Sequence, residues 1–171
     1  MLRGINLGGH HKVPMAELRA LLTEAGYGNV RTYMQSGNVV LDGGGAPAGE
    51  LEDRVAALLA ERFGFAAPVI ARTRDELAGV VALNPLADVV TDPKRYQVTF
   101  LAEPPDPGLM ERLEATAAGE ERVEAHGREI YAWHPDGIAR SKLGNAMAGP
   151  RLGATARNWS TVTTLLSLAD S

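Results

Sequence analysis

Apolar residues recur with a helical period in the first half of the chain. The spacing i, i+3, i+4, i+7 of one helix face is followed by Leu18, Leu21, Leu22 and Ala25. Pro14 fits the first turn of this helix, and Gly26 ends it. A second helix is predicted from Leu51 to Phe63-Gly64.

Between these helices the pattern changes to the alternation of a strand. Apolar or β-favouring residues alternate with polar ones from Val30 to Gln35, and Ser36-Gly37 makes a tight turn into the strand 38–41. Short strands are also predicted at residues 1–7 and 68–71. The order strand, helix, strand, strand, helix, strand is that of a ferredoxin-like unit.

The second half repeats this order loosely. The predicted elements are a helix from Asp75, a strand at 96–101, a helix at 109–117, a hairpin of 122–125 with 130–133 around Gly127, a short helix at 142–147, a strand at 154–156 and a closing helix. We therefore expect an α+β fold of two tandem ferredoxin-like (βαββαβ) halves with antiparallel sheets. The expected halves are 1–73 and 74–171, in one compact unit. The residues predicted to be buried are Leu18, Leu21, Val39, Leu58, Val98, Phe100 and Leu165.

Composition is that of an ordinary globular domain, with 45% apolar and 22% charged residues. The chain has no cysteine, which excludes disulfides, thiolate metal sites and cysteine nucleophiles. No apolar run approaches the ~20 residues that span a bilayer, and no secretory signal pattern is present. A cytoplasmic protein is the expectation.

Charge is unevenly distributed along the chain. The net charge of −4 argues against a general nucleic-acid binder. Acidic residues are concentrated in residues 103–129, which contain eight acids and three arginines. In contrast, Arg3 and Lys12 are the charged residues among the first sixteen, and 137–169 holds no acid but contains Arg140, Lys142, Arg151 and Arg157.

The opening segment from Arg3 to Gly9 combines a guanidinium, a carboxamide and three glycines ahead of a helix. Such a segment suits an anion, because free N–H groups and the helix dipole both favour negative charge. Its glycine spacing matches neither a P-loop nor a dinucleotide fingerprint. The alternative is a flexible strand-to-helix connection, although a connection has no need of Arg3 and Asn6.

Two further segments carry polar residues that are candidates for a site. Gln35-Ser36-Gly37-Asn38 is first of all a hairpin turn, and its carboxamides are placed near Arg3 or Asn6 if the first strand lies beside the third. In the closing segment, Asn158 is a natural N-cap and Trp159 a candidate core residue. Arg157 beside a helix N-terminus opposes the dipole, a conflict that a bound anion resolves.

Catalytic and metal signatures are not found. The four histidines, at 10, 11, 126 and 134, have no carboxylate at ligand spacing, so no metal and no cofactor are predicted. Gly-x-Ser-x-Gly and Ser-x-x-Lys motifs are absent, and no acid/base pair is indicated by spacing, which leaves catalysis open. An RNA-recognition function is weakly supported, because the strands offer aromatic residues only singly, at Tyr33, Tyr96, Phe100 and Tyr131.

Several of these segments together resemble the bacterial domain-of-unknown-function 1697 family. The resemblance rests on Leu2–Gly9, Lys12–Met15 with Gln35–Val40, Asn84-Pro85, Val98–Leu101, Ser141-Lys142 and Ala154–Val162. His10-His11 departs from the family pattern, which is more often basic or polar there. The resemblance implies a fold and no established activity, and it brings no catalytic residues.

The function predicted from the sequence is binding of a phosphate-bearing or other anionic ligand, such as a nucleotide or a nucleic-acid end, in a basic cleft where the two ends of the chain meet. The ligand-binding residues predicted for it are Arg3, Asn6, Gly8, Gly9, Lys12, Gln35, Ser36, Asn38, Lys142, Arg157, Asn158 and Trp159. The alternative is a protein-interaction or assembly domain without a small-molecule ligand.

Overall fold

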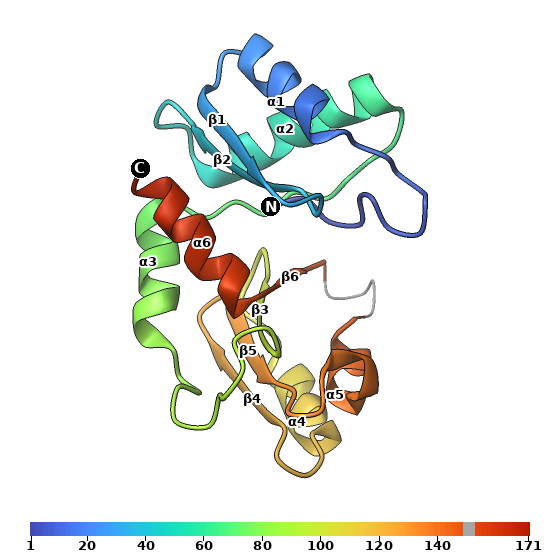
Figure 1. Cartoon of the computed structure of the whole chain (residues 1–171), viewed down its shortest axis with the longest axis vertical. Helices are drawn as coiled ribbons and strands as arrows, with labels where there is room; N and C mark the ends of the chain where they lie inside the picture. The colour runs from blue at the N-terminus through green and yellow to red at the C-terminus, as the bar shows by residue number, and fades with distance from the viewer. Residues whose placement is uncertain (149–152) are drawn as a thin grey trace. The chain divides into compact units, whose positions relative to one another are not determined.

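The computed structural model describes residues 1–148 and 153–171, and these residues form two compact units. The first unit is Met1–Glu76 with Leu165–Ser171, and the second is Leu77–Thr164. The described chain is α+β, with six α-helices and two antiparallel sheets (Figure 1). None of the helices in this part of the chain is long and apolar enough to cross a membrane.

The first unit places two helices against a two-stranded sheet. Its elements are α1 (Met15–Glu24), β1 (Gly28–Tyr33), β2 (Asn38–Asp42), α2 (Ala48–Phe63) and the beginning of α3 (Arg74–Leu83). β1 and β2 pair antiparallel, with Thr32 opposite Val39 and Tyr33 opposite Asn38. Leu18 and Leu22 of α1 share one apolar core with Val55 and Leu59 of α2. The predicted helices and hairpin are confirmed, with their ends shifted by a few residues.

The strands predicted at 1–7 and 68–71 are wrong as regular strands. The two segments pair through an isolated antiparallel bridge between Leu2 and Val69, and the N-terminal amine donates to Ile70 O at 2.8 Å. Leu2 N also donates to Gly37 O at 2.8 Å, so Leu2 lies beside the start of β2. Gly4 has a left-handed backbone (φ +70°), which ends the extended conformation before a longer pairing forms.

Residues 6–11 instead form a small hairpin. Asn6 N donates to His11 O at 3.1 Å, and His10 N donates to Leu7 O at 3.0 Å. Gly8 and Gly9 between them are both left-handed, with φ of +56° and +81°, which two-residue hairpin turns require and glycine supplies without steric cost. The predicted break at Gly8-Gly9 is therefore an ordered turn.

The second unit is built on a four-stranded antiparallel sheet. Its elements are β3 (Tyr96–Phe100), α4 (Pro107–Thr116), β4 (Arg122–His126), β5 (Glu129–Trp133), a 3-10 helix (Ile138–Arg140), α5 (Lys142–Met147), β6 (Thr155–Asn158) and the beginning of α6 (Trp159–Ala169). The strand order is β4-β5-β3-β6. β3 is central and pairs with both β5 and β6.

Helices cover both faces of this sheet. On one face, Leu113 of α4 and Leu143 of α5 share a core with Ile130 of β5. On the other face, Tyr131 Oη donates to Val80 O of α3 at 3.4 Å, and the Tyr96 ring stacks on Trp159 of α6 with 4.9 Å between centroids. Tyr96, Phe100 and Tyr131 are buried, so none of these three strand aromatics is exposed to stack on a base.

Four of the seven residues predicted to be buried are buried: Leu18, Val98, Phe100 and Leu165. Leu21, Val39 and Leu58 are half-buried. All three belong to elements of the first unit, where a sheet of only two regular strands offers less cover than the four-stranded sheet around Val98.

Candidate functional site

The segment 3–12 and the turn 34–37 of the first unit are joined by one side chain. The Asn6 carboxamide accepts from Val13 N at 2.8 Å, donates to Val13 O at 3.0 Å and donates to Gln35 O at 2.7 Å. These bonds fix the segment both to the entrance of α1 and to the β1–β2 turn. We call residues 3–12 and 34–37 together the loop–turn joint.

Left-handed backbone conformations gather in the loop–turn joint. Asn6, His11 and Met34 have φ of +55°, +49° and +59°, and they are three of the five non-glycine residues with positive φ in the described chain. Such conformations cost about 1–3 kcal/mol each and persist only where the surroundings impose them. The His11 ring stacks on Phe65 at 4.3 Å and helps to hold this geometry.

The surface of the loop–turn joint is cationic with two exposed apolar side chains. Lys12 and His10 are exposed and Arg3 is half-buried, and the first acid in the sequence is Glu17. Leu7 and Met34 expose 67% and 61% of their surface. Of the predicted site residues, Arg3, Asn6, Gly8, Gly9, Lys12, Gln35 and Ser36 lie in this one place.

Asn38 follows the joint but has a structural role. It is fully buried, and its Nδ2 donates to Tyr33 O at 3.1 Å and to Ser36 Oγ at 3.0 Å. Asn6 is committed to backbone groups in the same way. The carboxamides of Asn6 and Asn38, which the sequence offered as ligand donors, therefore already have protein partners.

In the second unit, two predicted site residues have the structural roles that the sequence also allowed. Asn158 Oδ1 accepts from Thr161 N at 2.9 Å, which caps α6. Trp159 packs on Tyr96, as described above. Lys142 is exposed at the first position of α5, and Arg151 lies outside the described residues.

Arg157 lies on β6 opposite Val98 of the central strand. Its Nη1 donates to Thr155 Oγ1 and to Ala156 O, both at 2.7 Å. Burial lowers the pKa of Arg157 to about 10, because the charged guanidinium is removed from water. The backbone position and these two bonds give Arg157 a defined place in the second unit.

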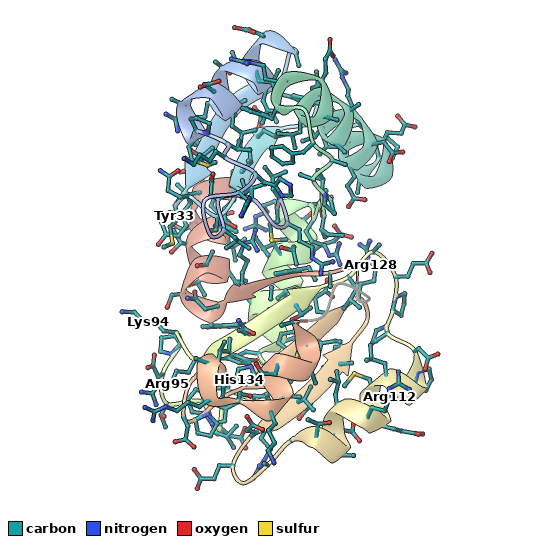
Figure 2. All side chains as sticks on the ribbon, turned by 90° about the vertical axis from the view of Figure 1, so that its right-hand side faces the viewer. Tyr33, Lys94, Arg95, Arg112, Arg128 and His134 are labelled. Atoms are coloured by element: carbon teal, nitrogen blue, oxygen red, sulfur yellow. The ribbon has the colours of Figure 1, made fainter. Side chains whose placement is uncertain are left out.

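A polar cluster of Glu121, His134 and Ser141 is a feature that the sequence analysis missed. His134 and Ser141 are buried, and Ser141 Oγ lies 2.8 Å from His134 Nδ1 and donates to Glu121 Oε1. Figure 2 labels His134, which lies beside the ribbon of α5. The residues are 7 and 20 positions apart, a spacing without a motif, and only Ser141 at a helix N-cap carried a signal.

This cluster lacks the geometry of a nucleophilic triad. Ser141 contacts the imidazole at Nδ1 and donates its hydrogen bond to the Glu121 carboxylate. Ser141 is also buried. Among the described residues there is also no group of three or more His, Asp or Glu side chains that suits a metal ion.

Comparison with known proteins places the chain in a family. The family model described as "Protein of unknown function (DUF1697)" matches residues 1–131, which include the N-terminal segment, and the chain belongs to this family. No curated protein matches the chain.

A solved structure of a conserved bacterial protein from Streptococcus pneumoniae is similar to the whole chain. The two are 21% identical, with a TM-score of 0.75, and the match covers 99% of this chain and 96% of the other. This likeness supports the fold.

Proposed function

We propose that the chain binds an anionic, phosphate-bearing ligand, such as a nucleotide or a nucleic-acid end, at the loop–turn joint. The observation that carries this proposal is the gathering of three strained non-glycine residues, Asn6, His11 and Met34, on two adjoining segments. Strain of this kind is found at ligand sites, where an already ordered loop lowers the entropy cost of binding.

Charge selects the class of ligand. Arg3 and Lys12 supply positive charge, and the first sixteen residues contain no acid. A guanidinium and backbone N–H groups are the donors that phosphate and carboxylate oxygens accept best. Lys142 and Arg157 belong to the second unit, and their role as ligand-binding residues stays a prediction.

A thermal-shift assay with inorganic phosphate, mononucleotides and short oligonucleotides tests this proposal, because a ligand of the folded state raises stability by mass action. We expect a saturable rise in Tm that Lys12→Ala reduces and that the matched change Lys94→Ala, an exposed lysine in the second unit, leaves unchanged. The absence of any shift, or an equal shift in all three proteins, contradicts the proposal.

One observation favours the alternative, a protein-interaction domain. Leu7 and Met34 are two of the three large apolar side chains that the described chain exposes most, and both belong to the loop–turn joint. Sedimentation of Leu7→Ser and Met34→Ser beside the parent protein separates the two functions. A change in assembly with no effect on the phosphate response favours interaction.

We also propose that both units are ferredoxin-like. In the second unit, the strand order β4-β5-β3-β6 and the chain order β3, α4, β4, β5, α5, β6 support this fold. In the first unit, the bridge between Leu2 and Val69 stands where two further strands belong. An experimental structure tests the assignment.

A cytoplasmic location is also proposed. It is supported by the lack of cysteine, and cell fractionation tests it.

A further inference from the structure

The buried polar cluster joins three segments of the second unit at the start of α5. Ser141 Oγ accepts from Gly144 N at 2.7 Å, and this bond caps the helix. Glu121 Oε1 accepts the proton of Ser141, and Glu121 Oε2 accepts from Ala118 N at 3.0 Å. His134, directly after β5, completes the cluster through Nδ1. The cap of α5 therefore depends on all three side chains.

The hydrogen-bond pattern fixes the proton on the imidazole. A serine hydroxyl donates one hydrogen bond, and Ser141 donates it to Glu121. Ser141 Oγ must therefore accept from His134, so the short contact between them requires a proton on Nδ1. His134 is thus the neutral Nδ1–H tautomer. Its Nε2 is buried and has no hydrogen-bond partner in the described part of the chain. A second proton at Nε2 creates a buried cation with an unsatisfied donor.

The charged groups around His134 do not compensate for such a proton. Glu121 Oε1 lies 4.0 Å from Nδ1 and already accepts from Ser141 Oγ, while Glu121 Oε2 accepts from Ala118 N. On the β3 side, His134 N donates to Arg95 O, while the Arg95 guanidinium bonds to Pro135 O and pairs with Asp92. Burial lowers the pKa of His134, and Glu121 opposes this only in part. The other charged residues of the adjoining segments are exposed: Glu111, Arg112, Glu114, Glu120, Arg122, Asp136, Arg140 and Lys142.

We propose that this cluster is a pH-sensitive switch on α5, in which proton uptake by His134 breaks the Ser141 cap and frees the first turn of the helix together with Lys142. The sign follows from linkage. An open, solvated His134 takes a proton below about pH 6.5, whereas the closed form resists it. The open form is then favoured up to tenfold for each pH unit below about 6.5, until the closed form also takes the proton.

NMR spectroscopy of the full chain tests the switch directly. Nitrogen shifts of the His134 ring report its tautomer, and the protection factor of the Gly144 amide reports the cap. We expect Nδ1–H at pH 7.5, and a fall in Gly144 protection of up to tenfold per pH unit below about 6.5. His134→Asn offers Ser141 an N–H donor that does not titrate, so its Gly144 protection stays level. The matched change His126→Asn, at the exposed end of β4, keeps the pH step.

Several results overturn the proposal. These are a ring proton on Nε2 at neutral pH, constant Gly144 protection from pH 7.5 to 5 in the parent chain, or a step that persists in His134→Asn. If that variant does not fold, the parent chain alone decides: the fall in Gly144 protection must begin at about pH 6.5 and must level off at the pH where the His134 ring titrates. Because the switch is read without any ligand, its failure is distinguishable from failure of the anion-binding proposal.

Discussion

Single carboxamide side chains hold several turns of this protein in place. Asn6 ties the N-terminal hairpin to the β1–β2 turn, Asn38 closes that turn from inside, and Asn158 caps α6. Each satisfies backbone groups that regular secondary structure leaves unpaired. Their loss therefore acts on stability before it acts on any ligand.

Substitution of Asn6 separates the role of its side chain from that of its backbone. Asn6→Gly keeps the left-handed backbone and removes three hydrogen bonds, so we expect the free energy of unfolding to fall by about 1–3 kcal/mol. Asn6→Ala adds a left-handed alanine and costs about 1–2 kcal/mol more. Urea denaturation measures both. Equal stability of the two variants contradicts the assigned strain.

Gly37 is required for two reasons, and a second glycine isolates one of them. It has φ of +76°, and a Cβ there would lie 2.6 Å from Leu2 Cβ. Gly37→Ala should therefore lower the unfolding free energy by about 2–4 kcal/mol, from strain and overpacking together. Gly44→Ala, with φ of +63° and open space around it, should cost only about 1–2 kcal/mol. A similar loss of unfolding free energy in both variants would show that the Leu2 side chain moves to make room for the new Cβ.

At the scale of elements, periodicity predicted the helices and paired strands well, because each buries one face over several turns or residues. α2 ends at Phe63 with a left-handed Gly64, as the sequence indicates. The strands predicted at 1–7 and 68–71 are wrong, because the segments form one bridge between Leu2 and Val69, and segments this short carry no periodicity that separates a bridge from a strand. The candidate site was predicted by residue type. Residue type cannot show that Asn6 donates to two backbone carbonyls, or that Asn38 donates to Tyr33 O and Ser36 Oγ.

The cap of α6 gives a prediction at this scale. Asn158→Ala leaves Thr161 N without its acceptor and should lower the unfolding free energy by about 1 kcal/mol. Asn158→Asp keeps an acceptor and adds favourable charge at a helix N-terminus, so its stability should stay close to that of the parent. Thermal unfolding checks both. A stable Asn158→Ala would remove the structural role and leave the predicted ligand role.

At the scale of the whole molecule, the first unit is assembled from two separate stretches of chain. Leu165 is buried, Arg74 Nε pairs with Asp170 at 2.6 Å, and Arg31 Nη1 donates to Ser171 Oγ at 2.5 Å. The exposed ion pair between Arg74 and Asp170 contributes little to stability by itself. Truncation of a buried leucine to alanine, by contrast, lowers the unfolding free energy of proteins by about 2–5 kcal/mol.

Removal of residues 165–171 should therefore loosen the first unit more than the second. We expect hydrogen exchange to rise across α1, β1 and β2 while β3 and β5 keep their protection, because those strands belong to the stretch 77–164. Arg74→Ala is the mild control, with a change below about 1 kcal/mol. Uniform loss of protection in both units would show that they unfold as one.

The discontinuous first unit also sets an order of events during synthesis. Domains generally fold as they leave the ribosome, the N-terminal one first. Here residues 1–76 emerge early but lack the stretch from Leu165 to Ser171, while the intervening unit is complete at Thr164. Residues 1–76 are therefore made before the second unit, yet their own unit is completed only after it, once the stretch from Leu165 to Ser171 has been synthesised.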